Sequence, residues 1–267
     1  MTLSHGDNGA IVALISGGHA SGKRSGAYIL KDQLEKLFGG SKISIKLINM
    51  NNYLVTSEKQ KLGSRQPNDY DFIRLRDDLN LYIDRIEYEV IIVYGLYALF
   101  DKQICDLATV RIFIDCDADV RLGRWIKRDV LKESHEGKTD QEVEDLKEQE
   151  KIKLEKLLNV YLNYSRQEMK LYINDTKENA DIILPRGADA TGFKLIVDGL
   201  KVTLLPLLQT THRSDSQTST FSENRSGSFN NRDTFIQNLK NLSSEPSVMS
   251  LTNDNFTNTK KIFYDLN

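Results

Sequence analysis

The sequence of 267 residues contains only two cysteines, Cys105 and Cys116. Because they lack the spacing of metal ligands and cannot form a disulfide framework, we expect a protein of a reducing compartment. The formal net charge of −2 gives no reason to expect nucleic-acid binding. The first ten residues, MTLSHGDNGA, contain no apolar signal core, and no stretch of the sequence approaches a membrane span. We therefore expect a soluble intracellular protein in the cytoplasm, and a nuclear location stays open.

No internal repeat is visible, but the composition of the sequence changes sharply near Thr210. Residues 210–267 are rich in Ser, Thr, Asn and Asp and contain few apolar residues. Such a segment cannot bury enough apolar surface to offset the entropy that is lost on ordering. We therefore predict a folded domain over residues 9–209 and a disordered tail over residues 210–267. Short apolar spots in the tail leave open a docking role toward a protein partner.

Short apolar runs alternate with longer segments of helical spacing in the predicted domain. Five runs are typical of strands: IVALIS, KISIKLINM, YEVIIVYG, TVRIFIDC and ADIILP. YEVIIVYG is almost entirely apolar, as expected for a strand in a sheet that is covered on both faces. The alternation predicts a three-layer α/β domain with a mainly parallel five-stranded sheet and right-handed crossovers. Residues 119–172 indicate a long charged helical region, and residues 190–208 indicate a final helix.

The strand IVALIS is followed by GGHASGKRS, residues 17–25, and then by a helix. Glycines let the backbone wrap phosphate oxygens, and the free N–H groups at the start of a helix attract anions. Lys23 adds a positive charge at the β- and γ-phosphates of a nucleotide. We therefore predict a phosphate-binding loop. Its predicted nucleotide-binding residues are Gly17, Gly18, His19, Ala20, Ser21, Gly22, Lys23, Arg24 and Ser25.

Arg24 interrupts the pattern G-x-x-x-x-G-K-[ST] at the position of the hydroxyl. That hydroxyl normally contributes a ligand to Mg²⁺, whereas a guanidinium group has no lone pair to give to a metal. Two alternatives stay open at this point. Either Ser25 takes over the metal contact, or the Arg24 guanidinium occupies part of the metal site and pairs with phosphate directly. We expect weakened Mg²⁺ binding with nucleotide affinity partly kept.

Three motifs together resemble those of the uridine/cytidine kinase family, within the wider phosphoribulokinase and uridine kinase group. GGHASGKRS resembles the family's GGSASGKTT, and ADIILPRGAD is similar to its ADVIIPRG. IFIDCDADVRLGRWIKRD resembles its F-V-D-x-D-A-D-x-R-L-x-R-R-x-x-R-D stretch. The resemblance covers residues 11–208. It implies a P-loop kinase-like fold with a mobile lid, and transfer of a phosphoryl group from ATP or GTP to a nucleoside hydroxyl.

The resemblance also implies roles for side chains outside the loop. Arg124 and Arg128 would act with Lys23 as catalytic residues on the transferred phosphoryl group. The spacing of Arg121, Arg124 and Arg128 places them on one helical face, which leaves a phosphate clamp and a solvated surface equally open. The nucleoside would be contacted by four residues: Asn51, Tyr53, Tyr70 and Asp71.

Several positions depart from the family's pattern. Its acidic base after the second strand falls on Met50 or Asn51, and neither side chain can accept the substrate proton. Tyr94 stands where the family has a Glu near the metal. The hairpin that holds the base is missing between Ile86 and YEVIIVYG. Since a general base alone is worth roughly 10²–10⁴-fold in rate, these departures predict weak or lost activity.

Two hypotheses about function therefore stay open, with a weaker third. The first is a divergent nucleoside kinase that uses ATP or GTP. The second is a catalytically silent, nucleotide-binding pseudokinase that acts through a protein partner, at the tail or at the charged helical region. The third is a kinase for a different small substrate, because the missing hairpin controls base recognition more than phosphoryl transfer.

Overall fold

The computed structural model of the chain describes residues 10–38, 43–55, 65–131, 139–211 and 231–243. In these residues five strands form one sheet in the order β2-β3-β1-β4-β5, and every strand pair is parallel. The strands are β1 (Ile11–Gly17), β2 (Ile45–Asn49), β3 (Val90–Tyr94), β4 (Val110–Ile114) and β5 (Ile182–Leu184). The predicted five-stranded parallel sheet is thus confirmed.

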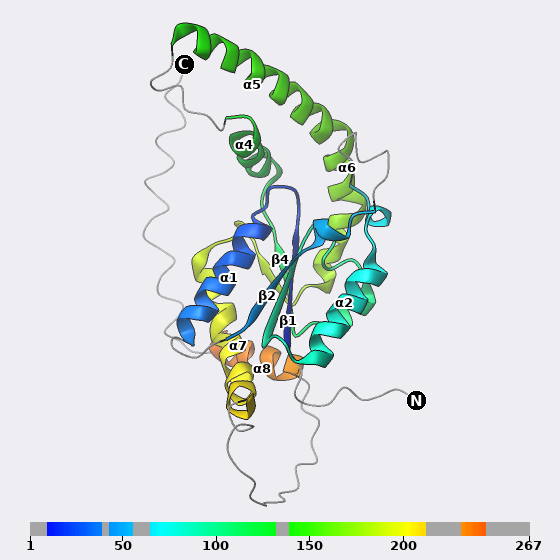
Figure 1. The fold of residues 1–267 in the computed structure, drawn as a ribbon, viewed down its shortest axis with the longest axis vertical. Helices are drawn as coiled ribbons and strands as arrows, with labels where there is room; N and C mark the ends of the chain where they lie inside the picture. Colours follow the sequence, from blue (N-terminus) through cyan, green and yellow to red (C-terminus); the bar gives the residue numbers. More distant parts are fainter. Residues whose placement is uncertain (1–9, 39–42, 56–64, 132–138, 212–230, 244–267) are drawn as a thin grey trace, which may run out of the picture.

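Helices cover both faces of this sheet, and others lie beyond its edges (Figure 1). The α-helices are α1 (Lys23–Leu37), α2 (Phe72–Arg85), α3 (Lys102–Asp106), α4 (Ala118–Asp129), α5 (Asp140–Val160), α6 (Arg166–Glu168), α7 (Ala190–Thr211) and α8 (Asn231–Ser243). Short 3₁₀ segments are η1 (Met50–Tyr53), η3 (Pro67–Asp69) and η6 (Asn174–Asn179). Two π-helical segments, η4 (Tyr161–Ser165) and η5 (Met169–Ile173), flank α6.

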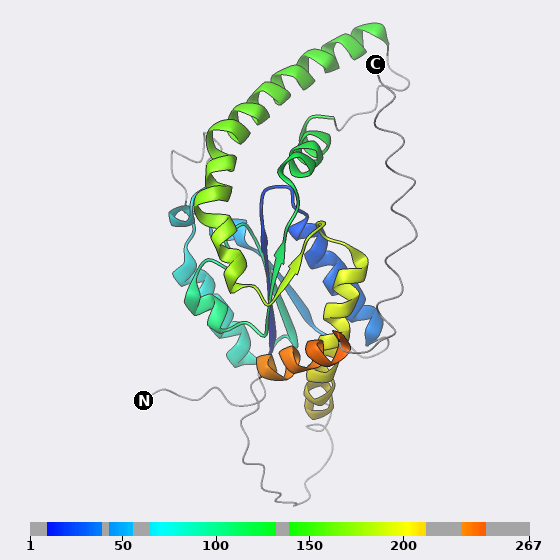
Figure 2. The ribbon, with the colours of Figure 1, turned by 180° about the vertical axis from the view of Figure 1, so that it is seen from behind.

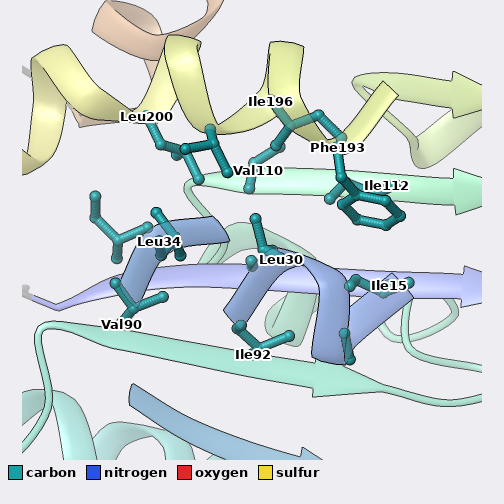
Figure 3. Packing of buried hydrophobic residues seen from close by; sticks show 14 of the residues in the cluster. Ile15, Leu30, Leu34, Val90, Ile92, Val110, Ile112, Phe193, Ile196 and Leu200 are labelled. Carbon is teal, nitrogen blue, oxygen red and sulfur yellow. The ribbon is translucent and has the colours of Figure 1, made fainter. Parts of the chain in front are cut away.

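Two hydrophobic cores lie on opposite faces of the sheet. On one face, Leu30 of α1 and Phe193 of α7 pack over Ile15 and Ile112 (Figure 3). The core on the other face joins residues of α2, such as Leu75, to alternate residues of β1. Since side chains alternate along a strand, β1 feeds both cores and is buried along its whole length. The predicted three-layer arrangement is confirmed.

The long charged region that the sequence predicts is divided into several helices. α4 ends at Asp129, and α5 begins after Thr139, which forms a capping box with Glu142. Helix α5 begins far from the sheet and runs back toward it, where η4, α6 and η5 continue it (Figures 1 and 2). Among the helices that the structure describes, none is long and apolar enough to cross a membrane.

Helix α8 corrects the prediction of disorder for residues 231–243. The Phe235 side chain is fully buried and packs beside Gly199 of α7. Arg232 donates a 2.7 Å hydrogen bond to Asp181, which also pairs with Arg111. The composition of the whole tail hides this helix because its few apolar side chains are gathered on one helical face. The rest of the predicted tail after Thr211 lies outside the described residues.

Candidate active site

The phosphate loop connects β1 to α1 at the carboxyl edge of the sheet. Gly17 has φ 147° and Gly22 has φ 106°, and residues other than glycine rarely adopt such backbone angles. A Cβ atom at Gly17 would lie 2.3 Å from the Ile114 carbonyl oxygen, so a larger residue is excluded there. Lys23 is the first residue of α1. The backbone therefore adopts the shape that the motif predicts, with the helix N-terminus open to an anion.

Lys23 turns its ammonium group back onto the loop. Its Nζ donates a 2.6 Å hydrogen bond to the Gly18 carbonyl oxygen. Burial, together with the positive charges of Arg121 and Arg128, lowers the pKa of Lys23 to about 7. A dianionic phosphate would relieve this repulsion. The loop thus holds a concentration of positive charge that suits a polyphosphate.

Two arginines of α4 lie against the loop. The Arg121 side chain is 7% exposed, and its Nη1 atom would lie 2.5 Å from a Cβ atom at Gly18. Arg124 Nη1 lies 3.5 Å from the Ser21 carbonyl oxygen. Arg128, which the sequence groups with them, instead pairs with the neighbouring Asp129 at 2.7 Å. The structure therefore brings Lys23, Arg121 and Arg124 to the loop, and Arg128 acts on Lys23 through its charge.

The Ser21 hydroxyl is fully buried in the loop and has no hydrogen-bond partner among the described residues. Buried polar groups in native proteins nearly always have a partner. A phosphate oxygen held by the loop amides can accept a hydrogen bond from such a hydroxyl. This unpaired group, together with the cations around it, fits a nucleotide phosphate.

Arg24 does not enter the loop. Its guanidinium lies over the Tyr28 ring, 5.7 Å from the centroid, on the exposed side of α1. Ser25, the remaining hydroxyl, is also exposed on α1. No group of three His, Cys, Asp or Glu side chains in the described ranges could hold a metal ion. In this structure the Arg24 side chain thus contacts Tyr28 and not the loop, and the two alternatives for the metal contact stay predictions.

The four predicted nucleoside contacts divide into two pairs. The Tyr70 hydroxyl lies 3.4 Å from Asn51 Oδ1, so the structure brings these two residues together. The Tyr53 hydroxyl donates to Asp78 at 2.8 Å, and Asp71 caps α2 by accepting from the Arg74 amide. Tyr53 and Asp71 therefore have partners within the fold.

Glu168 is a buried carboxylate at this site that the sequence analysis missed. It is 3% exposed, and its Oε2 atom lies 2.9 Å from His19 Nε2 in the phosphate loop. Its Oε1 atom accepts a 2.6 Å hydrogen bond from the Arg65 amide. The signal was present in the sequence, because Glu168 lies at helical spacing from Tyr161, Tyr164 and Tyr172. An acid within such a stripe faces the protein interior.

The comparisons with known proteins point to one family. Residues 82–191 match the Phosphoribulokinase / Uridine kinase family. A Saccharomyces cerevisiae protein named "Putative uridine kinase DAS2" is 32% identical over 205 residues, which cover 71% of this chain and 77% of that protein. "Uridine-cytidine kinase A" of Dictyostelium discoideum is 38% identical over 101 residues, 38% of this chain and 17% of that protein. "Uridine kinase" of Halobacterium salinarum is 28% identical over 128 residues, 48% of this chain and 49% of that protein.

A parallel sheet with a glycine-rich loop between its central strand and α1 defines the chain as a P-loop kinase-like protein. Within that class, it belongs to the phosphoribulokinase/uridine kinase family, since it aligns with most of the S. cerevisiae protein. It spans less than half of the length of the D. discoideum and H. salinarum proteins.

Proposed function

We propose that this protein binds ATP or GTP at the phosphate loop and transfers the γ-phosphoryl group to a hydroxyl of uridine or a related nucleoside. The observation that carries the proposal is the position of Lys23, which lies on the loop at Gly18 among the charges of Arg121 and Arg128. Phosphoryl transfer depends mainly on positioning and on stabilising charge at the phosphate oxygens. A nucleoside acceptor is the activity that the names of the relatives suggest.

The rate of transfer is expected to be low for two reasons. Met50 or Asn51 stands at the position of the family's acid, and Arg24 replaces the metal-binding hydroxyl. Because Arg24 lies over Tyr28, we propose that Mg²⁺ binds weakly and that protein cations hold most of the phosphate charge. In this proposal Lys23 and Arg124 are catalytic residues, and Arg128 contributes its charge at longer range.

A second candidate is a nucleotide-binding pseudokinase, which the orientation of Arg24 and the amide at Asn51 favour. Such a protein would act through a partner. The helix α5, 21 residues long, extends away from the sheet and is rich in charged residues (Figure 1), so it offers a surface for that contact. A cytoplasmic location and a role for the predicted tail stay predictions.

The test is phosphate transfer from γ-labelled ATP to uridine in the presence of Mg²⁺, with the unmutated protein and Lys23→Ala. Uridine monophosphate formed only by the unmutated protein supports the kinase. No product from a folded protein that binds ATP favours the pseudokinase. Repeating the assay with cytidine and with other small hydroxyl acceptors separates a silent protein from a kinase for a different substrate.

A further inference from the structure

We infer that His19 accepts the proton of the acceptor hydroxyl during phosphoryl transfer, and that Glu168 is the positioning residue that holds its imidazole. The inference rests on the proposed function, because it assigns a role within that transfer. His19 would thus act as the proton acceptor that Asn51 cannot provide, and it comes from a different part of the chain.

His19 lies at the end of the loop that would meet the terminal phosphate. It follows Gly18, whose carbonyl oxygen holds the Lys23 ammonium group. Its imidazole stacks on the Trp125 ring of α4, with the ring centroids 5.0 Å apart and the planes 5° from parallel. The side chain keeps 15% of its surface exposed. The ring is therefore fixed in orientation, and part of it is open to a substrate.

Glu168 uses both of its oxygen atoms to hold this arrangement. Oε2 faces His19 Nε2 at 2.9 Å, and Oε1 accepts from the Arg65 amide at 2.6 Å. A carboxylate only accepts hydrogen bonds, so the Nε2 atom of His19 must carry a hydrogen. In the neutral ring the lone pair then lies on Nδ1, which no hydrogen bond engages among the described contacts of His19. Nucleophile activation commonly uses an imidazole oriented in this way by a carboxylate.

A chain of contacts joins Glu168 to the acceptor side of the site. Arg65, whose amide donates to Glu168, accepts a 2.5 Å hydrogen bond from the Tyr97 hydroxyl at its carbonyl oxygen. The Tyr97 ring packs edge-on against Tyr70, with the centroids 5.4 Å apart, and Tyr70 contacts Asn51. Burial raises the pKa of Tyr70 to about 12, and the Glu168 charge contributes to the rise. The pair His19–Glu168 is thus connected through Arg65, Tyr97 and Tyr70 to Asn51, one of the two candidates for the position of the family's acid.

The transfer step balances with these groups. The acceptor oxygen forms a bond to the γ-phosphorus, and the bond from that phosphorus to the β,γ-bridging oxygen breaks. ADP leaves with the electron pair on the bridging oxygen. The hydroxyl proton passes to His19 Nδ1, and the resulting imidazolium is stabilised by Glu168 until solvent takes the proton.

The pH dependence of this step follows from the charges around His19. Burial lowers the pKa of His19 below its usual 6.5; Lys23 and Arg121 lower it further, while Glu168 opposes them. The imidazole is therefore uncharged at neutral pH, and its Nδ1 atom can accept a proton. The transfer rate should fall as the pH drops through the pKa of His19, because the protonated ring cannot accept another proton.

The experiment compares His19→Gln and Glu168→Gln in the labelled ATP-to-uridine assay, across pH 5 to 8. His19→Gln keeps a donor for Glu168 but has no basic nitrogen. We expect it to lower kcat by roughly 10²–10⁴-fold, to change the ATP affinity much less and to abolish the acidic limb of the rate profile. Glu168→Gln should lower kcat and move the acidic limb to lower pH, since the carboxylate raises the pKa of His19.

Asp181→Asn is the matched control. Asp181 is a similarly buried acid, 5% exposed, that pairs with Arg111 away from the loop. The control should leave both kcat and the acidic limb unchanged. Transfer by His19→Gln at the unmutated rate, with the acidic limb retained, would overturn the role of His19 and leave the proposed function standing. No transfer by the folded, ATP-binding unmutated protein would overturn both.

Discussion

The Lys23 ammonium group lies 2.6 Å from the Gly18 carbonyl oxygen, so this lysine is held by the loop that it follows. Burial and the positive charges of Arg121 and Arg128 lower the pKa of this ammonium group to about 7. Only the protonated amine attracts phosphate. Nucleotide binding should therefore be linked to the protonation of this single group.

ATP affinity should fall as the pH rises above about 7. Bound phosphates raise the pKa of Lys23. At a pH between the pKa values of the free and the nucleotide-bound protein, binding is therefore accompanied by the uptake of a proton. In that interval the affinity falls by up to about tenfold per pH unit. Calorimetric titration between pH 7 and 9 measures the effect. Lys23→Arg, which stays charged, should remove most of the slope, whereas an equal slope in that variant would show that another group titrates.

Replacement of Arg24 by Thr should restore a dependence of ATP affinity on Mg²⁺. In the unmutated protein we expect the affinity to change little with added Mg²⁺, because the guanidinium lies over Tyr28 and gives no lone pair. The lost stacking costs only about 0.5–1 kcal/mol at an exposed site, so the variant should fold. Nucleotide titrations with and without Mg²⁺ provide the measurement.

Ser25→Ala is the companion variant for the metal. It tests whether the remaining hydroxyl serves as a Mg²⁺ ligand. A strong Mg²⁺ dependence in the unmutated protein that Ser25→Ala removes would contradict the weak-metal account and assign the ligand to Ser25.

Phe235→Ala should destabilise the domain, although Phe235 lies in the segment predicted to be disordered. The side chain is fully buried against α7, and truncation of a buried Phe typically costs about 3–5 kcal/mol. Chemical unfolding curves give the change in the free energy of unfolding. Leu242→Ala on the same helix, at a residue 37% exposed, should change stability by less than about 0.5 kcal/mol. Equal stabilities for the two variants would show that the docking of α8 contributes little.

The parts of this fold that the sequence could predict are those encoded locally. The apolar run of β1 and the glycines at 17 and 22 lie within a dozen residues of each other, and both the strand and the loop were found. The position of Arg24 was also within reach, since Tyr28 is one helical turn away and the two side chains meet at i,i+4 spacing. The loop motif directs attention to phosphate and metal as partners for Arg24, whereas its partner in the structure is an aromatic ring.

The acidic partner of the loop could not be found in this way. His19 and Glu168 are separated by 149 positions in the chain, and only the docking of α6 beside the loop brings them into contact. Helix α8 could not be predicted for a different reason. The average composition of residues 210–267 predicts disorder, whereas Phe235 is buried against a local apolar surface of α7.

The most direct test of the account is the ATP affinity of the unmutated protein and of Lys23→Ala, measured at pH 6.5, where the amine is charged. Loss of a hydrogen bond to a charged group costs about 1.5–3 kcal/mol, so the affinity of the variant should be about 10- to 100-fold weaker, with unchanged unfolding curves. A folded Lys23→Ala protein that binds ATP as tightly as the unmutated protein would contradict the claim that this loop is the nucleotide site.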